Sequence, residues 1–88
     1  MPLKTTAHGP YEVSGLTVEI NVAERSDGRF NYDYSIFADK QLLGGGSGEE
    51  GSPSDLEAQV EAMGAAMERI DRLHRFRSLA IRNKHGHQ

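Results

Sequence analysis

The apolar and polar positions follow two periods, an alternating one before residue 45 and a helical one after residue 52. Apolar side chains alternate with polar ones over residues 16–22 and 30–36, which is typical of half-buried β-strands. Tyr11 and Val13 have the opposite parity, so a one-residue bulge at Gly15 would be needed to bring them onto the same face. A short third strand is expected over residues 41–45, at an edge because its glycines disfavour a strand interior.

The connection between the first two alternating stretches decides their pairing. A two-residue Asp-Gly turn would pair Val22 with Asp33 and mix apolar and polar side chains on each face. A three-residue loop over residues 26–28, with Gly28 in a left-handed conformation, pairs Val22 with Tyr32 instead. We therefore predict the three-residue loop, because a slip of one residue would turn every apolar side chain toward water.

The helical period predicts one amphipathic helix over residues 53–80 that covers the apolar face of the sheet. A helix of this length is longer than the predicted strands, so its C-terminal turns are expected to overhang the sheet. The fold class is thus α+β, an antiparallel three-stranded β-meander followed by one long C-terminal helix packed on one face. The predicted stripe consists of Leu56, Val60, Met63, Met67, Ile70 and His74, is widened by Leu73 and continues at Ile81.

The chain is expected to form a single small domain. Residues 1–10 are predicted to be an extended lead-in, residues 11–45 the meander, residues 44–52 a flexible glycine-rich loop and residues 81–88 a disordered basic tail. Leu, Ile, Val and Phe make up only eighteen of the 88 residues, which is close to the level of roughly 20% below which disorder is expected. Such a thin core favours additional support from a partner or a second copy.

The glycine-rich segment "LGGGSGEEGSPSD" raises the question of a phosphate-binding loop. Residues 46, 48 and 51 satisfy the spacing G-x-G-x-x-G, but the dinucleotide motif requires a parallel strand after the helix, and none is expected here. Carboxylates at residues 49, 50, 55 and 57 would oppose an anion. The end of the segment is better explained as a helix start, either with Ser54 as N-cap and Glu57 in a capping box or with Ser52 as N-cap before Pro53.

Charge is distributed unevenly along the chain. Residues 1–68 carry four basic and twelve acidic side chains, whereas residues 69–88 carry six basic side chains against Asp71 alone. Acids early and bases late in a helix complement its dipole, and a basic end can also meet phosphates. There is no cysteine and no long apolar run, so a soluble cytoplasmic protein without membrane association is expected.

No catalytic, cofactor or metal site is predicted. Asp71, His74 and Ser78 share a helix face, but no oxyanion donors are evident beside them because the N–H groups of a helix interior are already bonded. His85 and His87 lack a third oriented ligand for a metal. An enzyme and a small-molecule substrate are therefore not expected.

The order of meander and helix over residues 11–70 resembles the later part of double-stranded RNA-binding domains. In that family a lysine-rich cluster at the helix start holds the RNA backbone, whereas the corresponding stretch here, "SPSDLEAQVE", is acidic. The resemblance therefore implies an architecture and no RNA contact at these positions.

The sequence favours a non-enzymatic protein-protein interaction module or a homo-oligomer, with nucleic-acid association through the arginine-rich helix end as the alternative. Small residues beside the helix stripe could admit a second helix, or could lie against the sheet. Exposed aromatic residues could anchor a partner. The candidate residues are Ala62, Ala66, Phe37, Phe76, Arg69, Arg72, Arg75, Arg77 and Arg82.

Overall fold

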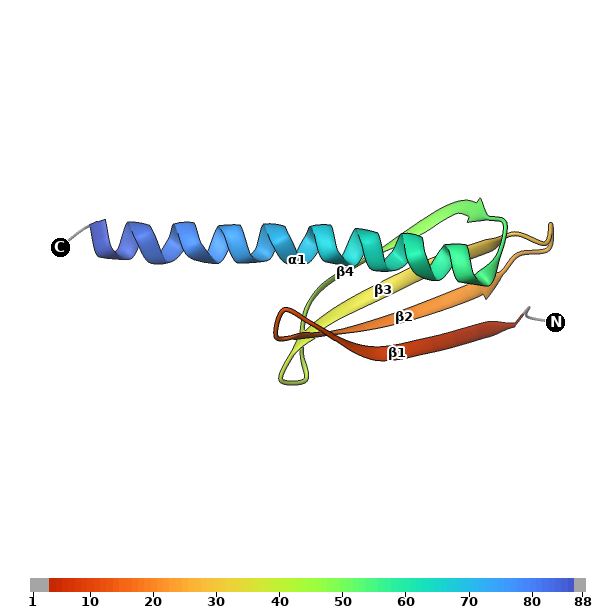
Figure 1. The fold of residues 1–88 in the computed structure, drawn as a ribbon, viewed down its shortest axis with the longest axis horizontal. Helices are drawn as coiled ribbons and strands as arrows, with labels where there is room; N and C mark the ends of the chain where they lie inside the picture. Colours follow the sequence, from red (N-terminus) through yellow and green to blue (C-terminus); the bar gives the residue numbers. More distant parts are fainter. Residues whose placement is uncertain (1–3, 87–88) are drawn as a thin grey trace.

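The computed structural model describes residues 4–86, with side chains for residues 4–75. Four antiparallel strands form one sheet in the order β1-β2-β3-β4, and one helix covers one of its faces (Figure 1). The fold is α+β as predicted, but the sheet has four strands, not three. The elements are β1 (Thr5–Val13), β2 (Leu16–Glu24), β3 (Phe30–Ala38), β4 (Gln41–Ser52) and α1 (Asp55–Gly86).

Strand β1 occupies most of the segment that was expected to be a lead-in. A two-residue turn of Ser14 and Gly15, with φ angles of 52° and 80°, reverses the chain between β1 and β2. Val13 consequently pairs with Leu16, and Tyr11 with Val18. The predicted bulge at Gly15 is wrong, because residues on two paired strands share a face without having the same parity. The irregularity in this pair lies between His8 and Tyr11.

The hairpin of β2 and β3 confirms the predicted three-residue loop. Val22 pairs with Tyr32, and the amide of Arg25 donates to the carbonyl of Arg29 at 2.7 Å around the loop. Gly28 has a φ of 82°, as the left-handed position of this loop requires. The register therefore places the valine and isoleucine side chains of β2 and the tyrosine rings of β3 on one face.

The four glycines at residues 44, 45, 46 and 48 lie inside strand β4, so the prediction of a loop over residues 44–52 is wrong. Gly46 pairs with Tyr34, and Gly48 pairs with Tyr32. A side chain at either glycine would collide with the tyrosine ring of its partner. Because the rings lie over these glycines, the missing side chains allow β4 to pair closely with β3 and to share its core face.

A row of small residues on α1 packs against the sheet. Ala58, Ala62 and Ala66 are fully buried and Ile70 is 2% exposed. They contact a sheet face whose largest buried side chains are Ile20, Ile36, Val18 and Val22. Among the described side chains, the predicted stripe is therefore wrong except at Ile70 and, in part, at Met63 and Leu73, and the side chain of Ile81 lies outside the described residues. Alanine lets the helix approach the sheet closely, and the large side chains of the sheet then fill the space between them.

The helix begins where the capping signal predicted. The hydroxyl of Ser54 accepts a hydrogen bond from the amide of Glu57 at 3.1 Å, whereas Ser52 is engaged by the carboxylate of Glu61 and does not cap the helix. At its other end α1 continues to Gly86. Residues 81–86 thus extend the helix, contrary to the predicted disordered tail, and His87 and Gln88 lie outside the described residues.

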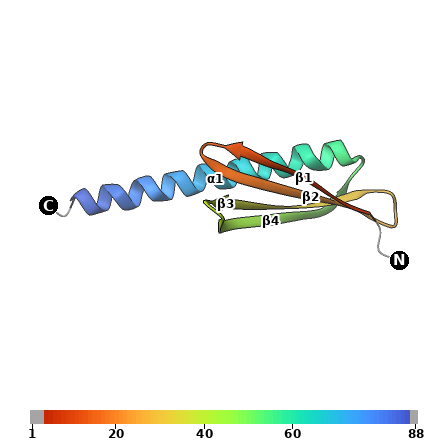
Figure 2. The same ribbon diagram turned by 90° about the horizontal axis from the view of Figure 1, so that it is seen from below.

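The two layers differ in length, and the C-terminal part of α1 extends beyond the sheet as predicted (Figure 1). At ~1.5 Å per residue the helix is about 48 Å long, and a nine-residue strand spans about 30 Å. Within the described residues nothing covers the outer face of the sheet, which lies in front of the helix in Figure 2. The molecule consequently measures 59 × 23 × 19 Å.

Two arginines of the β2–β3 loop hold the end of β4. Nη1 of Arg25 donates to the carbonyl of Glu49 at 3.0 Å, and Nε of Arg29 donates to the carbonyl of Gly51 at 2.9 Å. The β3–β4 pairing is irregular between Phe30 and Tyr32 at this point. The arginine side chains therefore bond carbonyl groups where the regular ladder is interrupted.

Candidate protein-binding surface

The helix carries a second apolar face that the sheet leaves uncovered. We define the helix seam as Leu56, Val60, Met63 and Met67. Leu56 is 67% exposed, Val60 is 64% exposed and Met67 is 53% exposed, while Met63 is partly buried against the core. The spacing of the seam is four, three and four residues, which is the repeat of a helix that packs against another helix. The buried row of Ala58, Ala62 and Ala66 has a different spacing, of four residues throughout.

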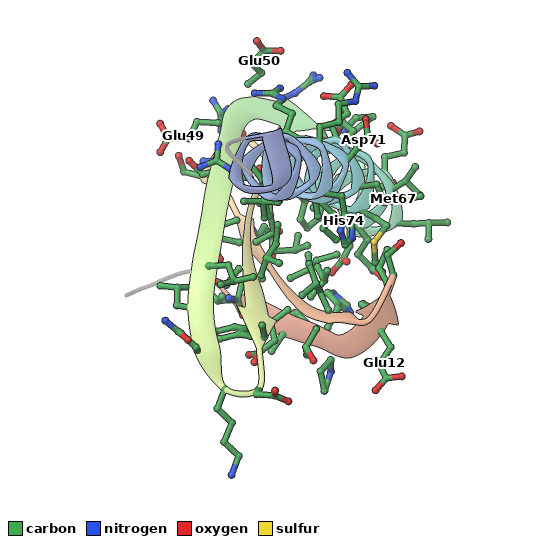
Figure 3. All side chains as sticks on the ribbon, turned by 90° about the vertical axis from the view of Figure 1, so that its left-hand side faces the viewer. Glu12, Glu49, Glu50, Met67, Asp71 and His74 are labelled. Atoms are coloured by element: carbon green, nitrogen blue, oxygen red, sulfur yellow. The ribbon has the colours of Figure 1, made fainter. Side chains whose placement is uncertain are left out.

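The seam faces the open side of the sheet, toward β1. Helix α1 packs mainly on β3, β4 and β2, and Met67 points away from the side on which Glu49 and Glu50 of β4 lie (Figure 3). Tyr11 of β1 shares the core face with its pair Val18 but is still 38% exposed. We call the helix seam together with Tyr11 the apolar margin, since these exposed side chains lie along the same side of the molecule.

The N-terminal end of this margin is closed by a polar contact. Nε2 of His8 lies 3.1 Å from Oδ1 of Asp55, which is within ion-pair distance although the atoms are not aligned for a hydrogen bond. This contact links β1 to the first residue of α1.

The two alanines predicted to form a partner-binding flank are not on the surface. Ala62 and Ala66 are both 0% exposed and belong to the hydrophobic core. The sequence left open whether these alanines contact a second helix or the sheet, and in the structure they lie against the sheet. The large apolar residues that sequence reasoning assigned to the core form the exposed seam in their place.

The three arginines of the C-terminal half whose side chains are described do not converge on one site. The side chain of Arg69 lies beside Gly44 of β4, and Arg75 forms an exposed ion pair with Asp71 at 2.9 Å. Arg72 is exposed on the helix. The side chains of Arg77 and Arg82 lie outside the described residues.

Of the two aromatic candidates, Phe37 and Phe76, only Phe37 has a described side chain. Phe37 is half-buried on the outer face of the sheet, paired with Thr17, and lines a shallow depression of about 260 Å³ with Glu19 and Lys40. The side chain of Phe76 lies outside the described residues. Phe37 is remote from the helix seam because the sheet separates them.

An acidic pocket of about 350 Å³ lies at the far end of β4. It is lined by Tyr32, Glu61 and residues 47–52. Burial raises the pKa of Tyr32 above its ordinary value of 10.0, and the negative charges of Glu61 and Glu50 raise it further, together with neighbouring Tyr34. The phenol is therefore held in its neutral form by its surroundings.

This environment predicts an alkaline loss of stability that depends on Tyr32. As pH rises through about 10, the unfolded chain loses its phenolic proton before the folded chain does, so the free energy of unfolding falls. We expect urea unfolding to show a smaller decrease between about pH 8 and pH 11 in Tyr32→Phe than in the wild type. Equal decreases in the two proteins would contradict this account of the pocket.

The catalytic and metal-binding groups that were considered in the sequence do not come together among the described side chains. Asp71 pairs with Arg75 instead of His74, and no group of three or more potential metal ligands occurs among the described side chains. His85 lies outside the described side chains. Within the described residues, the helix has no apolar stretch long enough to cross a membrane.

No protein-family model matches this chain, and neither a curated protein nor a solved structure is significantly similar to it. The candidate surface therefore rests on the geometry and chemistry of its own residues.

Proposed function

We propose that this protein is a non-enzymatic interaction module that binds another polypeptide through its helix seam. The observation that carries the proposal is the exposure of Leu56, Val60 and Met67 on a helix whose adjoining row of alanines is already buried. Single exposed apolar residues are common on protein surfaces, but these three recur at the spacing of a helix-packing face. An amphipathic helix that packs into this margin would bury them.

The margin has the features of a helix-binding surface beyond its apolar residues. Tyr11 offers a half-exposed aromatic ring along it, and tyrosine is among the residues enriched at the centres of interfaces. The polar contact of His8 and Asp55 marks one end. A partner helix thus finds an apolar strip with a polar border, the usual arrangement of a protein interface.

The test compares two matched changes of an exposed apolar residue to glutamate. Val60→Glu changes the seam, whereas Leu42→Glu changes a residue that is 61% exposed on β4 and away from the seam. Immobilised wild type and Leu42→Glu should retain the same bound polypeptides, and Val60→Glu should lose them. Circular dichroism should show all three proteins folded, since both positions are exposed. Retention of every bound polypeptide by Val60→Glu would contradict the proposal.

The alternative to protein binding is association with nucleic acid through the arginines of α1. Arg75 already forms an ion pair with Asp71, which lowers the number of unpaired cations at the surface. Binding of RNA or DNA that weakens with salt, is unchanged in Val60→Glu and is lost in Arg72→Glu would favour that alternative.

A further inference from the structure

We infer that the helix seam binds a second copy of this chain, in a symmetric dimer whose two α1 helices run antiparallel. The C-terminal part of each helix then covers the seam of the other copy. This inference rests on the proposed function, since it names the partner of the same surface. Three features of the molecule carry it: the overhang of α1, the lengths involved and the distribution of charge.

The overhang supplies a helix without a layer beneath it. Among the described side chains of α1, Ile70 is the last that belongs to the hydrophobic core, and Leu73 is half-buried. The helix nevertheless continues to Gly86, past the end of the sheet (Figure 1). The overhanging residues 74–86 form a helical segment of only about 13 residues, a length that is marginal in water without tertiary packing. A contact with a second copy would stabilise these turns.

The lengths of the two parts match. Residues 74–86 extend over about 18 Å, and the seam from Leu56 to Met67 extends over about 17 Å, at ~1.5 Å per residue. An antiparallel arrangement that places Leu56 opposite Gly86 puts the two-fold axis near Asp71. The two sheets then lie at opposite ends of the helix pair, so the second copy approaches the seam with its overhang and not with its sheet.

Charge selects the antiparallel orientation. The half of α1 that carries the seam contains acidic Asp55, Glu57, Glu61 and Glu68 and no base before Arg69, whereas the rest of the helix carries six bases against one acid. Antiparallel helices place the acidic half of each copy beside the basic half of the other. Parallel helices would place like charges together, which disfavours that pairing. The uneven charge of the helix therefore makes two antiparallel copies complementary to each other.

The first experiment measures the oligomeric state of the full chain by sedimentation equilibrium. Wild type and Leu42→Glu should form dimers, and the double variant Val60→Glu/Met67→Glu should dissociate at least about 100-fold more readily, because each charge would enter the apolar contact. If the wild type is a monomer at about 1 mM, where even a millimolar dimer would be partly populated, the inference is overturned. Retained capture of another polypeptide by the wild type would then leave the proposed function standing.

The second experiment tests charge pairing by exchange. Glu57→Lys/Glu68→Lys and Arg75→Glu/Arg82→Glu should each dimerise more weakly than the wild type at low salt. An equimolar mixture of the two variants should form a heterodimer. In it the new lysines of one variant face the new glutamates of the other, so opposite charges again lie across the helix pair. A mixture that remains as weak as its components would contradict the antiparallel charge arrangement.

The third experiment reads the orientation directly. The chain has no cysteine, so spin labels can be attached at single positions in Glu57→Cys and Glu68→Cys. About the proposed axis, the two copies of residue 68 are separated by about 9 Å along the helices and those of residue 57 by about 42 Å. A much longer label distance at residue 57 supports the antiparallel dimer. Equal distances at the two positions would indicate parallel helices and overturn it.

Discussion

Ala62→Glu is expected to unfold this protein. Ala62 is 0% exposed and lies between α1 and the sheet, so the carboxylate would be buried without a partner. An unpaired buried charge costs about 3–5 kcal/mol, and forcing the larger side chain into the packed site costs about 1–3 kcal/mol more. Together these costs are about as large as, or larger than, the stability on the order of 5 kcal/mol that a domain of this size has. Far-UV circular dichroism at 25 °C should therefore show a large loss of structure, and urea unfolding should lack a folded baseline.

The control for this change is Val60→Glu, two residues away on the same helix. Val60 is 64% exposed in a single copy, so at protein concentrations low enough for the chain to be monomeric the same carboxylate would remain in water. Under these conditions the free energy of unfolding should change by less than about 0.5 kcal/mol. A folded Ala62→Glu variant would mean that the alanine row does not face the sheet. The two variants together thus separate the packing face of α1 from its seam.

Gly46→Ala is expected to destabilise the protein by about 2 kcal/mol, the middle of the range for overpacking. A Cβ atom at this position would lie 2.7 Å from Oη of Tyr34 and 2.9 Å from two of its ring carbons. Tyr34 is only 8% exposed, so its ring has little room to move aside. The free energy of unfolding, measured in urea at neutral pH, gives the loss directly.

Gly44→Ala is the matched change on the same strand and face. The atoms that a Cβ would meet there belong to the guanidinium of Arg69, the nearest being Nε at 3.4 Å. That group is the end of a flexible and exposed side chain, so Gly44→Ala should cost much less than Gly46→Ala. Equal losses at the two positions would show that a general effect of replacing glycine, and not the ring of Tyr34, determines the stability of β4.

The parts of the fold that follow from alternation could be predicted from sequence. The register of β2 and β3 depends on which side chains share a face, and the pairing of Val22 with Tyr32 was predictable for that reason. Strand β4 was not, because glycine has no side chain to alternate and is disfavoured in a strand interior. The missing information was the partner strand, because Tyr34 and Tyr32 of β3 lie over Gly46 and Gly48 of β4.

The candidate surface was misassigned for a related reason. Large apolar residues at helical spacing usually face a core, so Leu56, Val60 and Met67 were the expected contacts with the sheet. In this fold the sheet supplies the large side chains and the helix supplies alanines. The row of alanines at residues 58, 62 and 66 was the available sign in the sequence, but only the burial of that row shows which of the two helix faces remains open.

The contacts of Arg25 and Arg29 tie together parts of the chain that are distant in sequence. Both side chains reach from the β2–β3 loop to carbonyl groups just before the crossover from β4 to α1, and Glu61 of α1 engages Ser52 at the same point. Opening of that loop would release the last residues of β4 and loosen the anchor of the helix. Amide exchange in these three segments should consequently proceed through one shared opening, so the helix does not detach as an independent unit.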